Sequence, residues 1–219
     1  MLGKYYDPTV ALGCIALIVL LPFAFAGSSA QTAPPASSRP SSATKTIVPD
    51  AGQISKGFYN NSFFGFRYRM PYGWVDRTQD MNEDSTSAKS KALLGIFERP
   101  PEAAGSTINS AVVIAIESAA AYPGLKSPAQ YFGPLGEITQ ANGLTPANEA
   151  YEFPVDGRPI VRRDFMKKMA GGAVMHQSTL AWLDRGYVVS FTFIGGTDDE
   201  VQSLIEALAF GKTKTPAQK

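Results

Sequence analysis

The sequence predicts an α+β domain, an antiparallel β-sheet with helices packed on it, and the strongest evidence lies in its second half. Three extended runs follow one another there, at residues 159–169, 173–183 and 187–194. The two gaps contain glycine, which accepts the positive φ of a tight reversal, so the runs are expected to form an antiparallel meander. After residue 195 the spacing of apolar residues changes from two to about 3.6, which indicates a helix.

The chain begins with a segment that is typical of an export signal. An apolar run extends over residues 10–26, and Ala24 and Ala26 place small residues where a signal peptidase reads them. We therefore predict a signal peptide, or an uncleaved N-terminal anchor, at residues 1–26, and an extracytoplasmic location, periplasmic or secreted. The single cysteine, Cys14, lies in this segment, so no disulfide is expected in the body.

The next segment, residues 27–52, is rich in Ser, Ala, Pro and Thr and has almost no large apolar residue. Such a composition cannot bury enough surface to offset the entropy of ordering, so a disordered linker is predicted. Residues 53–211 have the size of one ordinary domain. Residues 212–219 are predicted to be a disordered tail.

The first half of the body also reads as mostly strand. Further strands are predicted at residues 64–70, 92–98, 110–117 and 147–153. Residues 79–91 are polar and are predicted to be loop or weak helix. Ser127 followed by Pro128 is a good helix start. Because Gly133, Pro134 and Gly136 follow closely, we expect that helix to be short.

The last predicted helix has the clearest local signals. Thr197 can act as its N-cap, and Glu200 three residues later completes a capping box. One apolar stripe is expected to pack on the meander, and it consists of Val201, Leu204, Ile205 and Leu208.

The two ends of the body resemble a known family. Residues 59–66, with the aromatic-Gly-Phe sequence at their end, and residues 70–74, Met-Pro-Tyr-Gly-Trp, are similar to the start of PsbP-like domains. Residues 186–192, with the helix that follows them and ends at 204–210, are similar to the end of these domains. The resemblance, to exported bacterial members, implies an α/β/α sandwich that is generally not an enzyme. Residues 79–150 contain no matching motif, so no binding residue is carried over.

Charge and motifs exclude several classes of function. The chain has 20 Lys and Arg against 19 Asp and Glu, whereas nucleic-acid binding requires a basic footprint. We therefore expect no nucleic-acid partner. The body has one His and no Cys, so a metal site is not expected. The sequence contains no phosphate loop or nucleophile motif, so we expect no cofactor and no catalytic residue. The sequence identifies no binding residue.

Two groups of polar residues are candidate sites. His176 is the only imidazole, and a hydrolase could be built around it with Ser178 and Asp164, but a hydrogen-bonded structural His is favoured. Basic residues also crowd one predicted strand, at Arg162, Arg163, Lys167 and Lys168. We interpret them as charges that protect a sheet edge from pairing, with an acidic partner or lipid head groups as the alternative.

Acidic and aromatic residues that could form a site are also expected to have structural or surface roles. The acids that could form a carboxylate pair are Glu117, Glu149, Glu152 and Asp156. They come from separate segments, so they are expected to be surface acids. A sugar- or peptide-binding face could be formed, if they were exposed, by Trp74, Trp182, Tyr59, Tyr68, Tyr72, Tyr151 and Tyr187. Most of them are instead expected to pack in the core.

These observations favour an exported, non-enzymatic domain that binds or stabilises another envelope or secreted protein. Contact with a membrane is expected only through residues 1–26, if they are not removed. A small-molecule or lipid-binding module with a cavity between sheet and helices is one alternative. A hydrolase built around His176 is the other.

Overall fold

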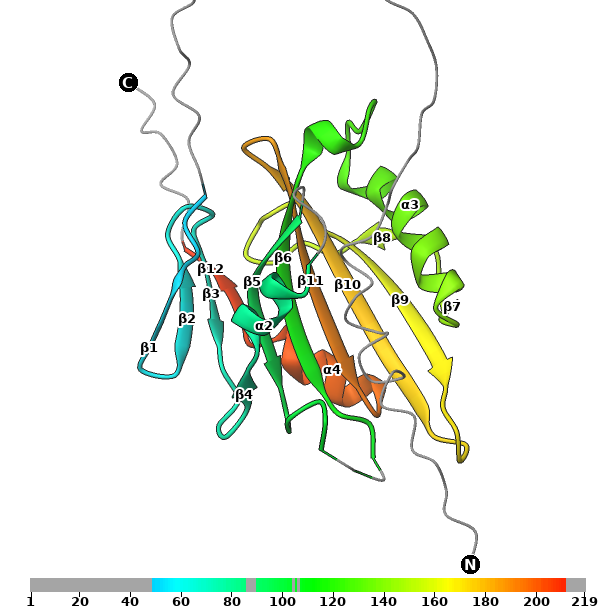
Figure 1. The fold of residues 1–219 in the computed structure, drawn as a ribbon. Helices are drawn as coiled ribbons and strands as arrows, with labels where there is room; N and C mark the ends of the chain where they lie inside the picture. Colours follow the sequence, from blue (N-terminus) through cyan, green and yellow to red (C-terminus); the bar gives the residue numbers. More distant parts are fainter. Residues whose placement is uncertain (1–48, 86–89, 104, 106, 212–219) are drawn as a thin grey trace, which may run out of the picture.

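A computed structural model describes residues 49–85, 90–103, 105 and 107–211 (Figure 1). The predicted signal peptide or anchor, the predicted linker up to residue 48 and the predicted tail from residue 212 lie outside the described residues. Within the described ranges, no helix is long and apolar enough to cross a membrane.

The central element is an eight-stranded antiparallel sheet. Its order is β4-β5-β6-β11-β10-β9-β7, and β8 also pairs with β9. The strands are β4 (Val75–Asp76), β5 (Ser90–Phe97), β6 (Ala111–Ser118), β7 (Thr145–Pro146), β8 (Tyr151–Glu152), β9 (Val161–Lys168), β10 (Val174–Asp184) and β11 (Tyr187–Gly195). The predicted meander is confirmed as β9-β10-β11. Gly171 and Gly172, both with φ of 89°, make the first of its reversals.

A second, four-stranded sheet packs on one face of the large sheet (Figure 1). Its strands, in spatial order, are β1 (Gln53–Ser55), β2 (Phe58–Asn61), β3 (Phe66–Arg69) and β12 (Leu208–Phe210). The ring centroid of Phe66 lies 5.1 Å from that of Phe191 on β11. Trp182 is buried against Phe210 and Trp74 is partly buried in the same core, so the packing interpretation of both tryptophans is confirmed. Of the five tyrosines in that set, Tyr72 and Tyr151 are exposed.

Helices cover both faces of the large sheet. α4 (Asp198–Ile205) shares one face with the small sheet, and α3 (Pro128–Ala141) lies on the opposite face, as does α2 (Thr78–Glu83) beside β5. A short 3₁₀ helix, η2 (Ala119–Ala121), follows β6. The predicted α+β class and its α/β/α layers are therefore confirmed. The small sheet is an addition that the sequence did not predict.

The prediction of a short helix after Ser127 was wrong, because α3 has 14 residues. The side chains of Ser127 and Gln130 form a capping box, and Pro128 occupies the first turn, where a proline costs nothing. The buried side of the helix is formed by Tyr131, Phe132, Leu135, Gly136 and Thr139. Burial of this stripe outweighs the weak helix propensity of the glycines and of the internal proline.

The predicted stripe of the last helix was wrong at its end. The Thr197 hydroxyl accepts from the backbone N–H of Glu200 at 3.2 Å, as predicted, but α4 ends at Ile205. Leu208 lies on β12, where it pairs with Tyr68 of β3 and is buried. The Glu200 carboxylate accepts from the backbone N–H of Gly196 at 2.8 Å rather than from the N-cap residue.

Two boundaries also differ from the prediction. Residues 49–52 fall in the predicted linker, yet the Tyr59 hydroxyl donates to the carbonyl of Ala51 at 2.9 Å and the Asn61 amide donates to that of Asp50 at 3.3 Å. The folded part thus includes residues before 53. The strand predicted at 147–153 is reduced to β8, because only Tyr151 and Glu152 pair with β9.

Candidate functional site

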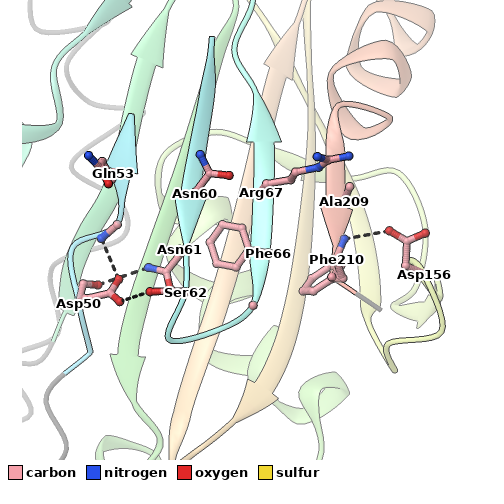
Figure 2. A pocket seen from close by; sticks show the side chains of 13 residues that line it. Asp50, Gln53, Asn60, Asn61, Ser62, Phe66, Arg67, Asp156, Ala209 and Phe210 are labelled. Atoms are coloured by element: carbon pink, nitrogen blue, oxygen red, sulfur yellow. Dashed lines mark hydrogen bonds between the residues drawn. The ribbon is translucent and has the colours of Figure 1, made fainter. Parts of the chain in front are cut away.

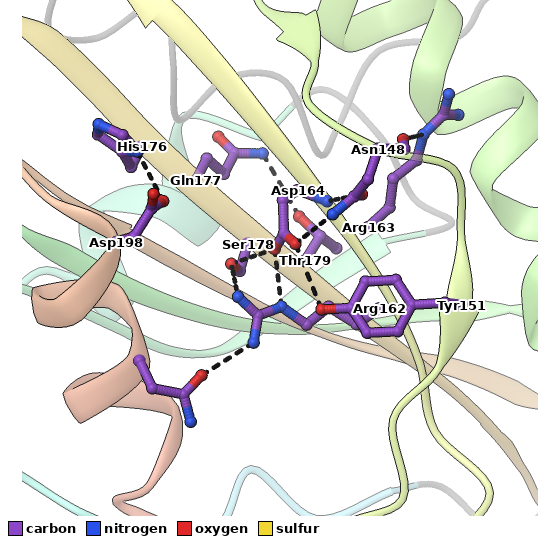
Figure 3. Close-up of polar contacts among 11 residues, drawn as sticks. Asn148, Tyr151, Arg162, Arg163, Asp164, His176, Gln177, Ser178, Thr179 and Asp198 are labelled. Atoms are coloured by element: carbon purple, nitrogen blue, oxygen red, sulfur yellow. Dashed lines mark hydrogen bonds and ion pairs between the residues drawn. The ribbon is translucent and has the colours of Figure 1, made fainter.

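Polar side chains of β9 and β10 form a hydrogen-bonded network on the face of the large sheet that carries α4 (Figure 3). Arg162 Nε lies 2.7 Å from Asp164 Oδ1. The Ser178 hydroxyl donates to the same oxygen and accepts from Arg162 Nη2 at 3.0 Å. Ser178 is the cross-strand partner of Asp164, and Arg162 lies two residues before Asp164 on β9. All three side chains therefore project to the same face of the sheet.

The network also ties the sheet to its neighbours. Arg162 Nη1 donates to Gln202 Oε1 of α4 at 3.0 Å. Asp164 Oδ2 accepts from Asn148 Nδ2 at 2.6 Å and from the Tyr151 hydroxyl at 3.4 Å. Burial acts to raise the pKa of Asp164, but the hydrogen bonds from Ser178, Arg162 and Asn148 outweigh it and hold the pKa below its ordinary value. The Asp164 carboxylate is therefore ionised, holds Arg162, Ser178 and Asn148 by hydrogen bonds, and is a poor proton acceptor.

His176 lies on the same face but belongs to a different contact. Its Nδ1 lies 2.7 Å from Asp198 Oδ1 at the start of α4, so the expected hydrogen-bonded His is confirmed. Within the described part of the chain, no hydrogen bond joins His176 to Ser178, whose hydroxyl is bonded to Asp164. The residues of the hydrolase alternative are thus brought to one face without the nucleophile–base contact that acyl chemistry needs.

Two exposed hydrophobic side chains flank this network. Tyr151 is 39% exposed and Met166 is 37% exposed. Tyr151 is the cross-strand partner of Arg162, and Met166 is that of His176. We call these four residues, Tyr151, Arg162, Met166 and His176, the β9 patch. Arg162 stacks over the Phe153 ring at 5.1 Å, which fixes its position in the patch.

The basic residues of β9 do not protect a free edge, so that interpretation was wrong. β7 and β8 pair along the outer edge of β9. Arg163, on the opposite face from Arg162, donates to the carbonyls of Phe132 at 3.3 Å and Asn148 at 3.2 Å. Arg162 and Arg163 thus link β9 to the helices on its two faces, Arg162 to α4 and Arg163 to α3. Of the four basic residues, Lys168 is exposed.

Glu117 was interpreted as a surface acid, and this was wrong. It is 7% exposed on β6 and accepts hydrogen bonds from the hydroxyls of Tyr131, at 2.6 Å, and Tyr122. Burial raises the pKa of Glu117 and outweighs both hydrogen bonds, which act to lower it. No spacing rule in the sequence joins these three residues. The other acids of that set, Glu149, Glu152 and Asp156, are exposed as expected.

The described residues contain no group of three or more His, Cys, Asp or Glu side chains that could hold a metal ion. The polar side chains of β9 and β10 form hydrogen bonds and ion pairs with one another and with α4.

No family model and no curated protein matches the chain. Among solved structures, it is similar to a cyanobacterial PsbP (CyanoP) from Synechocystis sp. PCC 6803, with 15% identity, a TM-score of 0.46, and coverage of 70% of this chain and 91% of that one. It is also similar to LpqN of Mycobacterium tuberculosis, a protein involved in cell envelope biogenesis, with 14% identity, a TM-score of 0.38, and coverage of 67% and 83%. A Pseudomonas aeruginosa protein of unknown function, PA94, matches with 15% identity, a TM-score of 0.36, and coverage of 64% and 83%.

One of these three structures is thus a PsbP, the family that the sequence resembles.

Proposed function

We propose that the chain is exported and that its domain binds another envelope or secreted protein without catalysing a reaction. The observation that carries this proposal is the β9 patch. Tyr151 and Met166 each keep more than a third of their surface in solvent, beside polar groups whose hydrogen bonds are already made within the domain. Aromatic residues, Met and Arg are the residue types that are enriched at protein interfaces, and exposed apolar side chains of this kind supply their anchors.

The rigidity of the patch supports protein binding. Arg162 is held by Asp164, Ser178 and the Phe153 ring, so it loses little side-chain entropy when a partner covers it. The three strands that carry the patch, β8, β9 and β10, lie in the large sheet, so the patch is not built on a loop. A surface that is ordered before binding leaves more of the contact energy for affinity.

The bonding of Ser178 and Asp164 supports a non-enzymatic role. A hydrolase built around His176 would require the Ser178 hydroxyl to leave Asp164 and reach the imidazole. That move would break the contact that also orients Arg162. The same residues serve a binding face without any rearrangement.

The test is site-specific cross-linking in native envelope extracts. A photoreactive residue placed at Met166 should give a discrete adduct, whereas the same residue at Gln140, exposed on α3 on the opposite side of the sheet, should not. Excess unlabelled chain should compete for the adduct, and the double variant Tyr151→Ala/Met166→Ala should fail to compete. Equal adducts at both positions, or competition by the double variant, would exclude the β9 patch as the binding face.

A further inference from the structure

A hollow lies on the small sheet (Figure 2), and its lining includes no residue of the β9 patch. Its volume is about 1240 Å³, and Asp50, Gln53, Asn60, Arg67, Asp156 and Ala209 are among the residues that line it. Small-molecule pockets usually measure about 300–1,000 Å³. The hollow is therefore large enough for an extended ligand that crosses several strands.

A row of side chains crosses the small sheet within this hollow. Gln53 pairs with Asn60, Asn60 pairs with Arg67, and Arg67 pairs with Ala209, so one residue from each of the four strands stands in line. Figure 2 shows these four side chains side by side on one face. Because neighbouring strands lie about 4.8 Å apart, the row is about 14 Å long.

The polar groups of this row are largely unused by the protein. Across the described residues, the Gln53 amide and the Arg67 guanidinium form no hydrogen bond or ion pair, and Arg67 stacks over the Phe58 ring at 5.4 Å. Asn60 makes only a long bond, 3.4 Å from its Nδ2 to the carbonyl of Phe58. The exposed amides thus offer both donors and acceptors, and the guanidinium offers donors.

Small residues make the hollow. Ala209 ends the row, and Gly65 and Gly211 also line the hollow. A Cβ placed on Gly65 would meet nothing within 4 Å, so the backbone is open to a ligand there. The outward face of the small sheet therefore presents a polar row beside open backbone, while the rings of Phe66 and Phe210 are buried between the two sheets.

Charge restricts the chemistry of that ligand. Asp50 and Asp156 stand at opposite ends of the hollow, with Arg67 between them (Figure 2). Asp50 is fixed by the backbone N–H of Gly52 and the Ser62 hydroxyl, both at 2.9 Å, and Asp156 accepts from the backbone N–H of Phe210 at 2.9 Å. Two carboxylates repel an anion such as a phosphate head group or an acidic peptide, and they accept hydrogen bonds from hydroxyl groups.

We propose that this hollow binds a neutral, linear oligosaccharide that lies across the four strands. Sugar hydroxyls both donate and accept, so they match the amides, the guanidinium and the two carboxylates together. The proposal concerns a different surface from the β9 patch and does not depend on it. It assigns the small sheet a binding role of its own.

The test is a titration of the purified full chain with chitotetraose, cellotetraose and maltotetraose, measured by calorimetry and by ¹⁵N NMR. We expect at least one of them to bind and to shift the amide signals of Asn60, Gly65, Arg67 and Gly211. Arg67→Ala and Asn60→Ala should each weaken binding about tenfold, since each removes hydrogen bonds to the ligand. Arg69→Ala is the matched control, because Arg69 is the next outward-facing residue of β3 and does not line the hollow.

The proposal is overturned if none of the three oligosaccharides binds. It is also overturned if Arg69→Ala weakens binding as much as Arg67→Ala, or if the shifted signals come from β9 and β10. Displacement of the bound oligosaccharide by inorganic phosphate at equal concentration would contradict the argument that the two carboxylates repel anions. None of these results bears on cross-linking at Met166, so failure of this site and failure of the proposed protein-binding function are separable.

Discussion

The attachment of the small sheet to the large one depends on Phe66, and Phe66→Ala measures it. The ring is 3% exposed, and its centroid lies 5.1 Å from that of Phe191, 5.9 Å from that of Tyr59 and 6.1 Å from that of Phe210. Removing a buried Phe side chain costs about 3 to 5 kcal/mol, which includes the cavity that remains. For a domain of this size, that loss corresponds to a fall of roughly 6 to 20 °C in the thermal midpoint.

Guanidinium denaturation followed by tryptophan fluorescence is a suitable assay, because the Trp182 ring lies 5.2 Å from Phe210 in the same cluster. The matched control is Phe58→Ala on β2, whose ring faces outward under Arg67. We expect Phe58→Ala to cost about 1 kcal/mol or less. If Phe66→Ala proved no more destabilising than Phe58→Ala at unchanged m-value, the small sheet would not be docked and the reasoning would fail.

The remaining predictions concern the last helix, the buried acid and the N-terminus. In urea denaturation, Leu204→Ala should lower the free energy of unfolding by about 2 to 5 kcal/mol, because Leu204 is buried. Glu206 is exposed, so Glu206→Gln should lower it by less than about 0.5 kcal/mol. Equal effects of the two substitutions would mean that α4 is not packed. Burial raises the pKa of Glu117, so the folded state keeps a proton on this carboxyl at pH values where the unfolded chain has released it. The contribution of protonated Glu117 to the free energy of unfolding is therefore complete below about pH 4.3 and is lost as pH rises through the pKa of the folded state. Glu117→Gln should therefore show a smaller loss of stability from pH 4 to 8 than the unchanged chain, and an identical slope would contradict the burial argument. N-terminal sequencing of the secreted protein should start at Gly27 or Gln31, whereas recovery of the intact chain in washed membranes would support an anchor.

The parts of the fold that depend on neighbouring residues could be predicted from the sequence. The meander β9-β10-β11 is joined by short glycine-containing turns, and its strands follow the alternation of apolar residues. The cap at Thr197 is set by residues within one turn of it. In both cases the signal and the structure lie in the same short stretch of chain.

The small sheet could not be predicted because its pairing is distant in sequence. β12 follows α4 almost at once, yet it pairs with β3, far back in the chain. Leu208 lies four residues after Leu204, so it fits a helical stripe as well as it fits the inner face of a strand. Only the presence of β3 beside it decides between the two.

The surfaces are also products of pairing rather than of motifs. His176 meets Asp198 across 22 residues, and Gln53, Asn60 and Arg67 stand in line only because their strands are in register. Each of these residues, taken alone, is an ordinary surface residue in the sequence. Their significance depends on which neighbour the fold brings to them.

The position of the two surfaces on different sheets has a consequence for their energetics. The β9 patch rests on the large sheet and on α4, whereas the hollow rests on the small sheet, and the aromatic cluster of Phe66, Phe191 and Phe210 lies between the sheets. Substitutions at separate surfaces without shared partners usually have additive effects. Arg67→Ala should therefore leave the binding of a protein at Met166 unchanged. Phe66→Ala, which loosens the contact between the sheets, is the substitution that should affect both surfaces together.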